Sequence, residues 1–390
     1  MDFDLTEEQL AVSELAARVL GDLSTPERLR VLDRQRTAGG GGDGLEGNGM
    51  DRDLWAALAD VGLTAIVVPE ELGGAGLGLV ELCGLLREVG RRTAAVPALA
   101  TLAGAALPIA RHGSETQRRR WLPGIGDGSI VATAAIVEPL GDPRVASLRA
   151  ERVTDGWRLD GERSNVAAGM IADLFVVPAS SPNGTIVALI PADSTGLERI
   201  AQRTTSGATE ALVRLSGVVV GDDALLGGSP LDGPSHGDAV HREVVDIATV
   251  AACAVMAGVS AEAVRLTGDY ATQREQFGRP IAAFQAVTQR AADAYVDAQA
   301  IELTMLQAAW RLDAGLPADR EIAVAKFYAA EAGQRALHAA QHLHGGMGVD
   351  RDYPLHRYFL LGKELELFLG GGSRQLLRLG AMLAADGVDW

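Results

Sequence analysis

The sequence predicts an α+β protein in which a small β domain lies between two helical domains. Apolar residues recur at helical spacing after residue 284, residues 130–220 read as short strands joined by Asp-Gly and Asn-Gly turns, and a capping box opens the chain. The chain has 390 residues, enough for two or three domains with a sizeable core. We expect an N-terminal helical domain at 1–128, a β-barrel domain at 129–226 and a C-terminal four-helix bundle at 238–390.

The N-terminal part is expected to be mainly helical. Thr6 begins a capping box with Gln9 for a helix that reaches about Leu20, and Pro26 suits the first turn of a second helix. In the stretch 37–50, seven of fourteen residues are Gly, which is typical of a loop. Further helices are expected at 51–61, 79–89, 94–111 and 115–122, and an extended segment at 66–69.

At Ile130 the sequence pattern changes from helical spacing of apolar residues to strand-like stretches. We expect strands in 130–137, 153–159, 174–190 and 212–220, because these stretches are apolar or alternate apolar with polar residues around tight turns. From Ala239 the pattern is helical again, with two long series of apolar residues at steps of three and four. The first runs through Phe284, Val287, Ala291, Ala294, Ala298, Ile301, Met305, Ala308 and Leu312, and the second through Ile322, Ala325, Ala329, Ala332, Ala336, Ala339 and Leu343.

Composition excludes several classes of function. A formal net charge of -16 argues against nucleic acid or an anionic membrane as a partner. Cys83 and Cys253 read as buried thiols, and His338 and His342, although one helical turn apart, have no companion ligands, so we expect no metal site. The acidic start is unlike a secretory signal, and the longest apolar stretch carries charges, so we expect a cytoplasmic protein.

The stretch Tyr270–Gln285, YATQREQFGRPIAAFQ, predicts a tight corner between two helices. Gly278 suits the position just after a helix, and Pro280 suits the first turn of the next one. Arg274 and Phe277 then lie at the tip, where a cation and an aromatic ring can hold a phosphate and a flat ring. The alternative is an ordinary bundle corner with a solvated arginine.

Four motifs resemble the acyl-CoA dehydrogenase family, in the family's order. The corner carries Arg-x-x-Phe-Gly-x-x-Ile-x-x-Phe-Gln, residues 342–359 read HLHGGMGVDRDYPLHRYF, residues 69–91 read PEELGGAGLGLVELCGLLREVGR, and Val137-Glu138-Pro139 precedes strand-like sequence. The resemblance implies that family's fold, a helical domain, a β-barrel and a helical bundle. It also implies FAD as the cofactor, oxidation of the α–β bond of an acyl-CoA thioester, and an electron-transfer flavoprotein as the acceptor.

In the resembling family one chain contacts the flavin ring and its neighbour holds the diphosphate and adenosine. The resemblance assigns the second task here to Arg274, Phe277, Gln285, His344, Gly345 and Gly346. His342 stands where the family has a Gln, and Gln341 is adjacent, so both are candidates for that contact.

The ring contacts and the base of the family are missing. Val137 replaces a Thr, and Asn165-Val166-Ala167 replaces Trp-Ile-Thr, so an aromatic and two hydroxyls are absent. The family's catalytic Glu falls on Leu369, or on Ala248 for relatives that carry it before the corner. Asp246 and Glu243 lie near Ala248, and neither should point the same way on a helix. Asp246 as an unusual base is kept as an alternative.

The sequence keeps the candidate contacts to the FAD diphosphate and adenosine, and it lacks the family's ring contacts and base. In this respect it resembles the non-catalytic subunits of actinobacterial heteromeric acyl-CoA dehydrogenases, several of which act on steroid side-chain CoA thioesters. Our leading hypothesis is therefore an α2β2 assembly with a catalytic homologue and FAD at the mixed interface. The first alternative is a self-sufficient homotetrameric dehydrogenase with an atypical base. The second is a flavin-free structural or CoA-binding protein on the same fold.

Overall fold

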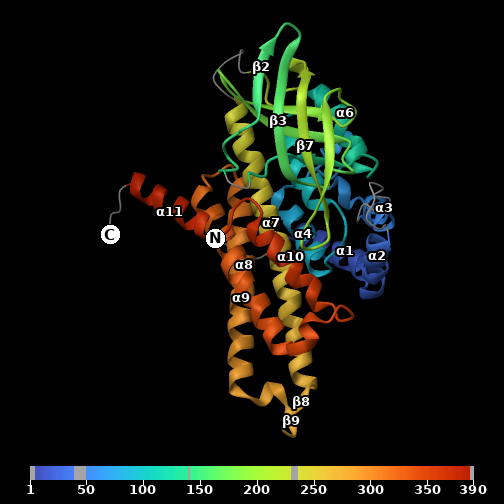
Figure 1. The fold of residues 1–390 in the computed structure, drawn as a ribbon, viewed down its shortest axis with the longest axis vertical. Helices are drawn as coiled ribbons and strands as arrows, with labels where there is room; N and C mark the ends of the chain where they lie inside the picture. The colour runs from blue at the N-terminus through green and yellow to red at the C-terminus, as the bar shows by residue number, and fades with distance from the viewer. Residues whose placement is uncertain (1–4, 39–49, 139–140, 230–235, 387–390) are drawn as a thin grey trace. The chain divides into compact units, whose positions relative to one another are not determined.

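The computed structural model describes residues 5–38, 50–138, 141–229 and 236–386, and the chain divides into two compact units (Figure 1). The first unit combines Met1–Val31, Cys83–Ala94 and Thr249–Trp390. The second combines Leu32–Leu82 and Ala95–Ala248. The mixed α+β class is confirmed, and each unit is described by itself below.

The first unit is helical. Its elements are α1 (Glu7–Leu23), the start of α2 (Pro26–Ala38), most of α4 (Leu79–Arg91), α7 (His236–Gln273) from Thr249 on, α8 (Gln285–Asp313), α9 (Asp319–His344), α10 (Leu355–Leu367) and α11 (Gly372–Asp386), with the short strands β8 (Glu275–Gln276) and β9 (Arg279–Pro280). The predicted capping box of α1 is present, since Thr6 Oγ1 accepts from the Gln9 amide and the Gln9 side chain accepts from the Thr6 amide.

Two glycines let helices of the first unit approach closely. A Cβ added at Gly258 of α7 would lie 1.8 Å from the Arg87 carbonyl oxygen of α4, and one added at Gly90 of α4 would lie 2.1 Å from the Val255 carbonyl oxygen of α7. No side chain fits either position, so the two helix backbones touch at this crossing. Alanine rows on α8 and α9 serve the same end, because Ala294, Ala336 and Ala339 pack together in a buried cluster.

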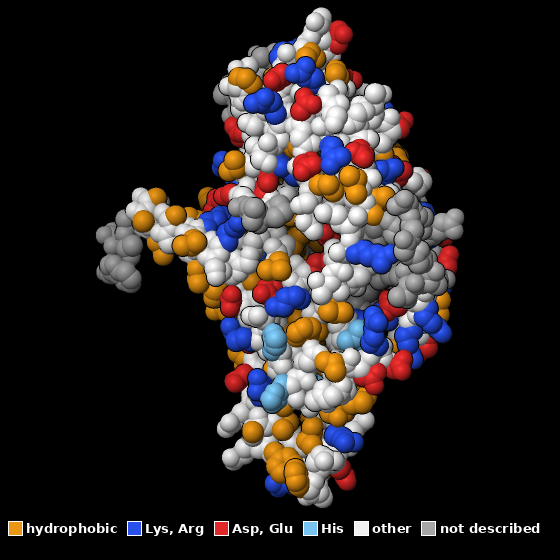
Figure 2. Space-filling view, in the orientation of Figure 1, with side chains coloured by type: hydrophobic (Ala, Val, Ile, Leu, Met, Phe, Trp, Pro, Cys, Tyr) orange, Lys and Arg blue, Asp and Glu red, His pale blue; other side chains and the backbone are white. Residues whose placement is uncertain are grey.

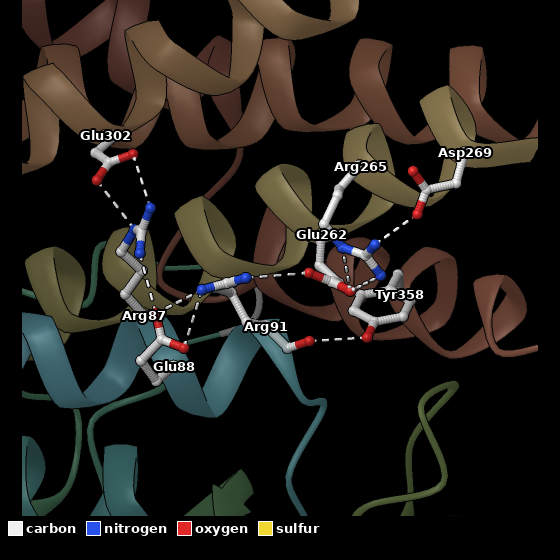
Figure 3. A network of polar contacts seen from close by, with 8 residues as sticks. All are labelled: Arg87, Glu88, Arg91, Glu262, Arg265, Asp269, Glu302 and Tyr358. Atoms are coloured by element: carbon white, nitrogen blue, oxygen red, sulfur yellow. Dashed lines mark hydrogen bonds and ion pairs between the residues drawn. The ribbon is translucent and has the colours of Figure 1, made fainter. Parts of the chain in front are cut away.

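A charged network stands beside this crossing (Figure 3). Its members are Arg87, Glu88 and Arg91 of α4, Glu262, Arg265 and Asp269 of α7, Glu302 of α8 and Tyr358 of α10. Glu88 and Glu262 are buried, and each is paired with two arginines. A buried carboxylate without its partner is strongly destabilising, so the network fixes how α4 and α7 are paired.

The second unit contains the sheet and its flanking helices. Its elements are α3 (Arg52–Asp60), α5 (Leu107–His112), α6 (Glu115–Gly126), β1 (Ala132–Ala134), β2 (Arg149–Val153), β3 (Gly156–Ala167), β4 (Leu174–Ser181), β5 (Gly184–Pro191), β6 (Leu197–Arg203) and β7 (Thr209–Val220), with 3-10 helices at Leu63–Ala65, Glu70–Leu72 and Asp222–Ala224 and a π-helix at Leu99–Ala106. Strands β3 and β7 form its longest ladder (Figure 1).

The sheet is curled and open. Its order is β1-β4-β2-β3-β7-β6, with β5 paired to β4, and no ladder joins β5 to β6 among the described strands. The Asp-Gly and Asn-Gly turns sit where predicted, between β2 and β3 and between β4 and β5. Trp157 and Phe175 fill the core of the sheet, together with the aliphatic residues that alternate along the same face of its strands. The curl is a sheet folded over its own core, as the β-domain prediction requires.

Several local predictions differ from the structure. Residues 66–68 form a turn after a 3-10 helix instead of an extended segment, and the expected helix 94–111 contains the π-helix Leu99–Ala106. Strand β6 was not predicted, and the Gly-rich stretch lies mainly outside the described residues. Within the described chain one helix, α7, is long and apolar enough to cross a membrane, and 94% of that window is buried inside the protein.

Candidate functional site

The predicted corner is a miniature β-hairpin. Helix α7 ends at Gln273, β8 pairs with β9, and the two residues between them, Phe277 and Gly278, have φ of 55° and 76°. Positive φ at both central residues defines a type I′ turn, the usual two-residue hairpin loop. The predicted roles of Gly278 after a helix and of Pro280 in the first turn of α8 are therefore wrong. Phe284 precedes α8 as its cap, after a 3-10 turn.

Phe277 has an unfavourable position in two respects. Its side chain is 93% exposed, and its backbone occupies the left-handed region, which costs a residue with a Cβ roughly 1–2 kcal/mol. Among the described aromatic rings, Phe284 lies next to it, edge to face at 6.1 Å between centroids. Strain and exposure maintained together point to a ligand that covers the ring.

Arg274 stands beside it as a cation with no side-chain partner among the described residues. Its backbone is fixed, since its amide donates to the Tyr270 carbonyl at 2.8 Å and its carbonyl accepts from the Ile281 amide at 2.8 Å. The guanidinium of Arg279 lies 4.3 Å from the ring centroid of Phe284. Apolar and cationic side chains meet at this end of the first unit (Figure 2), a combination suited to a phosphate next to a flat ring.

The Gly-Gly loop follows the end of α9. Gly345 has φ 58° and ψ -135°, a conformation reserved for glycine, and it begins a 3-10 helix over Gly345–Val349. A Cβ added at Gly345 or Gly346 would meet nothing within 4 Å, so the space above this backbone is open to a ligand. Both glycines are exposed, as are His342, Gln285, Arg274 and Phe277 among the predicted contacts.

Gln341 and His344, two of the predicted cofactor contacts, point into the protein. The Gln341 amide nitrogen donates to the Gly348 carbonyl at 3.0 Å, and its Oε1 is buried with no partner in the described chain. His344 is 3% exposed and uses both ring nitrogens within the unit. Their side chains support the loop from below, whereas His342, at the family's Gln position, is the exposed one. The helical spacing of residues 341–344 is the signal in the sequence that could have indicated which of these side chains point inward.

The ring-side residues of the second unit are engaged with their own chain. The Asn165 amide side chain donates to Glu210 at 2.9 Å, and its backbone amide donates to Gln202 at 2.8 Å. The Ala167 carbonyl accepts from the Thr133 hydroxyl at 2.6 Å, and Val137 is half-buried. No hydroxyl stands at Val137 or Ala167, so a flavin ring would find fewer hydrogen bonds here than in the resembling family.

No carboxylate stands at either expected base position. Leu369 is 4% exposed with φ 54°, and Ala248 is buried. Asp246 is ion-paired with Arg144, and Glu243 accepts hydrogen bonds from His112 at 2.7 Å and Arg111 at 2.8 Å. These bonds, that from His112 first, lower the pKa of Glu243 to about 2, which makes it a poor base. No group of three possible metal-binding side chains occurs in the part of the chain that is described.

Comparisons with known proteins identify the family. Residues 43–129 match the acyl-CoA dehydrogenase N-terminal domain, and residues 236–382 match the C-terminal domain. Acyl-CoA dehydrogenase FadE27 of Mycobacterium tuberculosis is 37% identical over 98% of this chain and 99% of its own. A chain of the ChsE4–ChsE5 complex from the same organism has a TM-score of 0.90 at 37% identity, covering 100% of both chains. A steroid ACAD variant of Tcur3481–Tcur3483 has a TM-score of 0.87 at 39% identity, covering 97% of this chain and 98% of that one. The chain belongs to the acyl-CoA dehydrogenase family.

Proposed function

We propose that this chain is the partner subunit of a heteromeric, FAD-dependent acyl-CoA dehydrogenase, in which it holds the diphosphate and adenosine of FAD for a catalytic homologue. The observation that carries the proposal is the contrast between its two half-sites. Phe277 is exposed and strained, and the Arg274 side chain has no partner in the described chain, while both base positions carry apolar residues. Exposing a large ring in an unfavourable conformation costs stability, so its retention argues for use.

The residues present fit the non-flavin end of FAD. Arg274 offers a cation for the diphosphate, Gly345 and Gly346 leave open backbone, and Phe277 presents a ring face. Gln341 supports this loop from within the protein, where its amide nitrogen donates to the Gly348 carbonyl at 3.0 Å. When bound, FAD accepts the hydride that leaves the β carbon of the acyl group.

The catalytic partner must supply what this chain lacks. It would provide the carboxylate that removes the α proton and the hydroxyls that bond the flavin ring. The similar ChsE4–ChsE5 is a complex and the similar Tcur3481–Tcur3483 is a steroid ACAD, which favours a hetero-oligomer and a bulky acyl-CoA thioester as substrate. We place the assembly in the cytoplasm, with an electron-transfer flavoprotein as the acceptor.

Replacing Arg274 with alanine tests the corner. A charge-assisted hydrogen bond to a phosphate is worth about 1.5–3 kcal/mol, so Arg274→Ala should weaken FAD binding by roughly tenfold to hundredfold in the complex. The complex is obtained by co-expression with each catalytic homologue of the source organism, and free FAD is measured by fluorescence after dilution. Fold and assembly should survive, because this side chain has no partner to lose in the described chain.

The exposed Arg52 of α3 provides the matched control, since Arg52→Ala removes the same charge from a different unit of the chain. It should leave the affinity for FAD unchanged. Unchanged affinity in Arg274→Ala as well would mean that the corner is an ordinary bundle corner, and the proposal would fail.

A further inference from the structure

His344 is a buried group that the proposed function leaves without a task. It ends α9, directly before the Gly-Gly loop. Its imidazole is stacked on the Tyr270 ring with centroids 4.4 Å apart and planes 23° from parallel. Its Nε2 lies 3.1 Å from the Tyr353 hydroxyl, and its Nδ1 lies 2.8 Å from the Ala340 carbonyl oxygen. A histidine held on two edges and one face is fixed in orientation.

These contacts assign the proton of the neutral ring. A carbonyl oxygen can only accept, so Nδ1 carries the hydrogen and donates to Ala340. The unprotonated Nε2 is then an acceptor, and the Tyr353 hydroxyl donates to it. Burial lowers the pKa of His344, which agrees with a neutral imidazole.

The three rings come from the segments that form the candidate nucleotide site. Tyr270 lies in the last turn of α7, and its carbonyl accepts from the Arg274 amide at the base of the hairpin. Tyr353 follows the Gly-Gly loop and its 3-10 helix, and its own carbonyl accepts from His356 Nδ1 at 2.7 Å. His344 thus joins the start of the hairpin to both ends of the loop.

Within the loop the described hydrogen bonds are local. The Gln341 side chain donates to the Gly348 carbonyl, the Gly345 amide donates to the His342 carbonyl, and the Asp350 amide donates to the Met347 carbonyl. Open space surrounds Gly345 and Gly346. Glycine is the residue with the most backbone freedom to lose on ordering. The position of the Gly-Gly backbone relative to Arg274 therefore depends on the His344 cluster.

We propose that His344 is a positioning residue, whose neutral imidazole, stacked on Tyr270 and bonded to Tyr353, sets the Gly345–Gly346 backbone and the Arg274 hairpin at the spacing that a dinucleotide diphosphate requires. The proposal rests on the proposed function for its ligand. We call the contacts of His344 with Tyr270 and Tyr353 the joint. These contacts do not depend on the ligand, so the joint can be tested separately.

Tyr353→Phe is the informative variant, because it removes the hydroxyl and keeps the ring. Tyr270→Phe is its matched control, since the Tyr270 ring and its stacking on His344 are kept and its hydroxyl makes no hydrogen bond in the described chain. In the full chain without FAD, amide hydrogen exchange of residues 345–350 should be at least threefold faster in Tyr353→Phe and unchanged in Tyr270→Phe. His344→Gln retains a hydrogen-bond acceptor on a flexible side chain. Its exchange rate for residues 345–350 should therefore lie between those of wild type and His344→Leu.

The second readout is FAD affinity in the reconstituted complex. Tyr353→Phe should weaken it by roughly threefold to tenfold, about the effect of one hydrogen bond. Tyr353→Phe should weaken FAD binding by a smaller factor when Arg274→Ala is already present, because the joint acts on FAD through the position of Arg274. A merely structural role would instead lower the melting temperature and leave the two effects on affinity additive.

The outcomes separate the two proposals. Faster exchange in Tyr353→Phe with no effect of Arg274→Ala on FAD would support the joint and refute the proposed ligand. Unchanged exchange and unchanged FAD affinity in Tyr353→Phe would overturn the joint, even if Arg274→Ala lowers FAD affinity as expected. Additive effects of Tyr353→Phe and Arg274→Ala would overturn the coupling to the hairpin.

Discussion

The resemblance to the family places its catalytic Glu at Leu369, and the substitution Leu369→Glu tests that assignment. The Leu369 side chain is 4% exposed, so a carboxyl placed there would be buried. Full burial of a leucine side chain is worth about 1.5–3 kcal/mol, and a buried polar group without a hydrogen bond costs about 1–3 kcal/mol. Together they predict a loss of roughly 2.5–6 kcal/mol with the new carboxyl protonated.

The loss should grow with pH. In the unfolded chain Glu ionises near its usual pKa of about 4.3, whereas burial raises the pKa in the folded chain. Stability is therefore lost progressively as pH rises above about 4.3, by about 1.4 kcal/mol for each unit that the folded-state pKa is raised. Leu369→Gln has a similar size and no charge, so its loss should be the same at pH 5 and pH 8.

Both variants keep a Cβ at φ 54°, so backbone strain cancels between them. Denaturant unfolding at pH 5 and pH 8 gives the comparison, alongside acyl-CoA oxidation with a dye acceptor. We expect no dehydrogenation by Leu369→Glu alone, because Val137, Asn165 and Ala167 still lack the ring contacts. A pH-independent loss would refute the burial argument and would point to a compensating cation such as Lys326, whose ammonium donates to the Leu365 carbonyl at 2.6 Å. Measurable α,β-oxidation would refute the account of an eroded flavin site.

Three further predictions concern the fold and the corner. Phe277→Gly should leave the melting temperature unchanged or slightly higher, because it relieves left-handed strain of about 1–2 kcal/mol, while it weakens FAD binding roughly threefold to tenfold; a lower melting temperature without an effect on FAD would contradict a ligand role. Burial lowers the pKa of His241 to about 4, so between pH 6.5 and pH 4 only the unfolded state gains the proton. The free energy of unfolding should therefore fall by about 3 kcal/mol over this range. His241→Gln should remove this pH dependence, and His236→Gln, at an exposed position, should keep it. Gly258→Ala should cost about 1–3 kcal/mol in denaturant unfolding, whereas Gly268→Ala on the same helix, with open space around it, should stabilise by up to about 1 kcal/mol; equal effects would refute the close crossing.

Much of the architecture was predictable because its signals are local. The capping boxes at Thr6 and Ser114 and the turns at Asp155-Gly156 and Asn183-Gly184 are set by residues within four positions of one another. Strand β6 lacked such a signal, since its residues are largely exposed and do not alternate. The π-helix is Ala-rich and buried, and its composition is that of an ordinary helix.

The candidate site was predictable in its residue types and not in its geometry. A Gly after an aromatic reads equally as a helix end and as a type I′ turn, and the two readings place Phe277 differently. The inward direction of Gln341 and His344 depends on Gly348, Tyr270 and Tyr353, which reach them through the tertiary fold. Which residues of such a motif touch a ligand and which support it is decided by packing.

The FAD content of the purified chain, alone and with a catalytic homologue, distinguishes a partner subunit from a self-sufficient dehydrogenase. We expect that the chain alone binds little FAD and does not oxidise acyl-CoA, and that the mixed complex binds FAD and is active. Stoichiometric yellow protein that turns over a CoA thioester without a partner would contradict the account and favour a homotetrameric dehydrogenase. Failure of every mixed complex to bind FAD through this chain would contradict it in the other direction and favour a flavin-free role on the same fold.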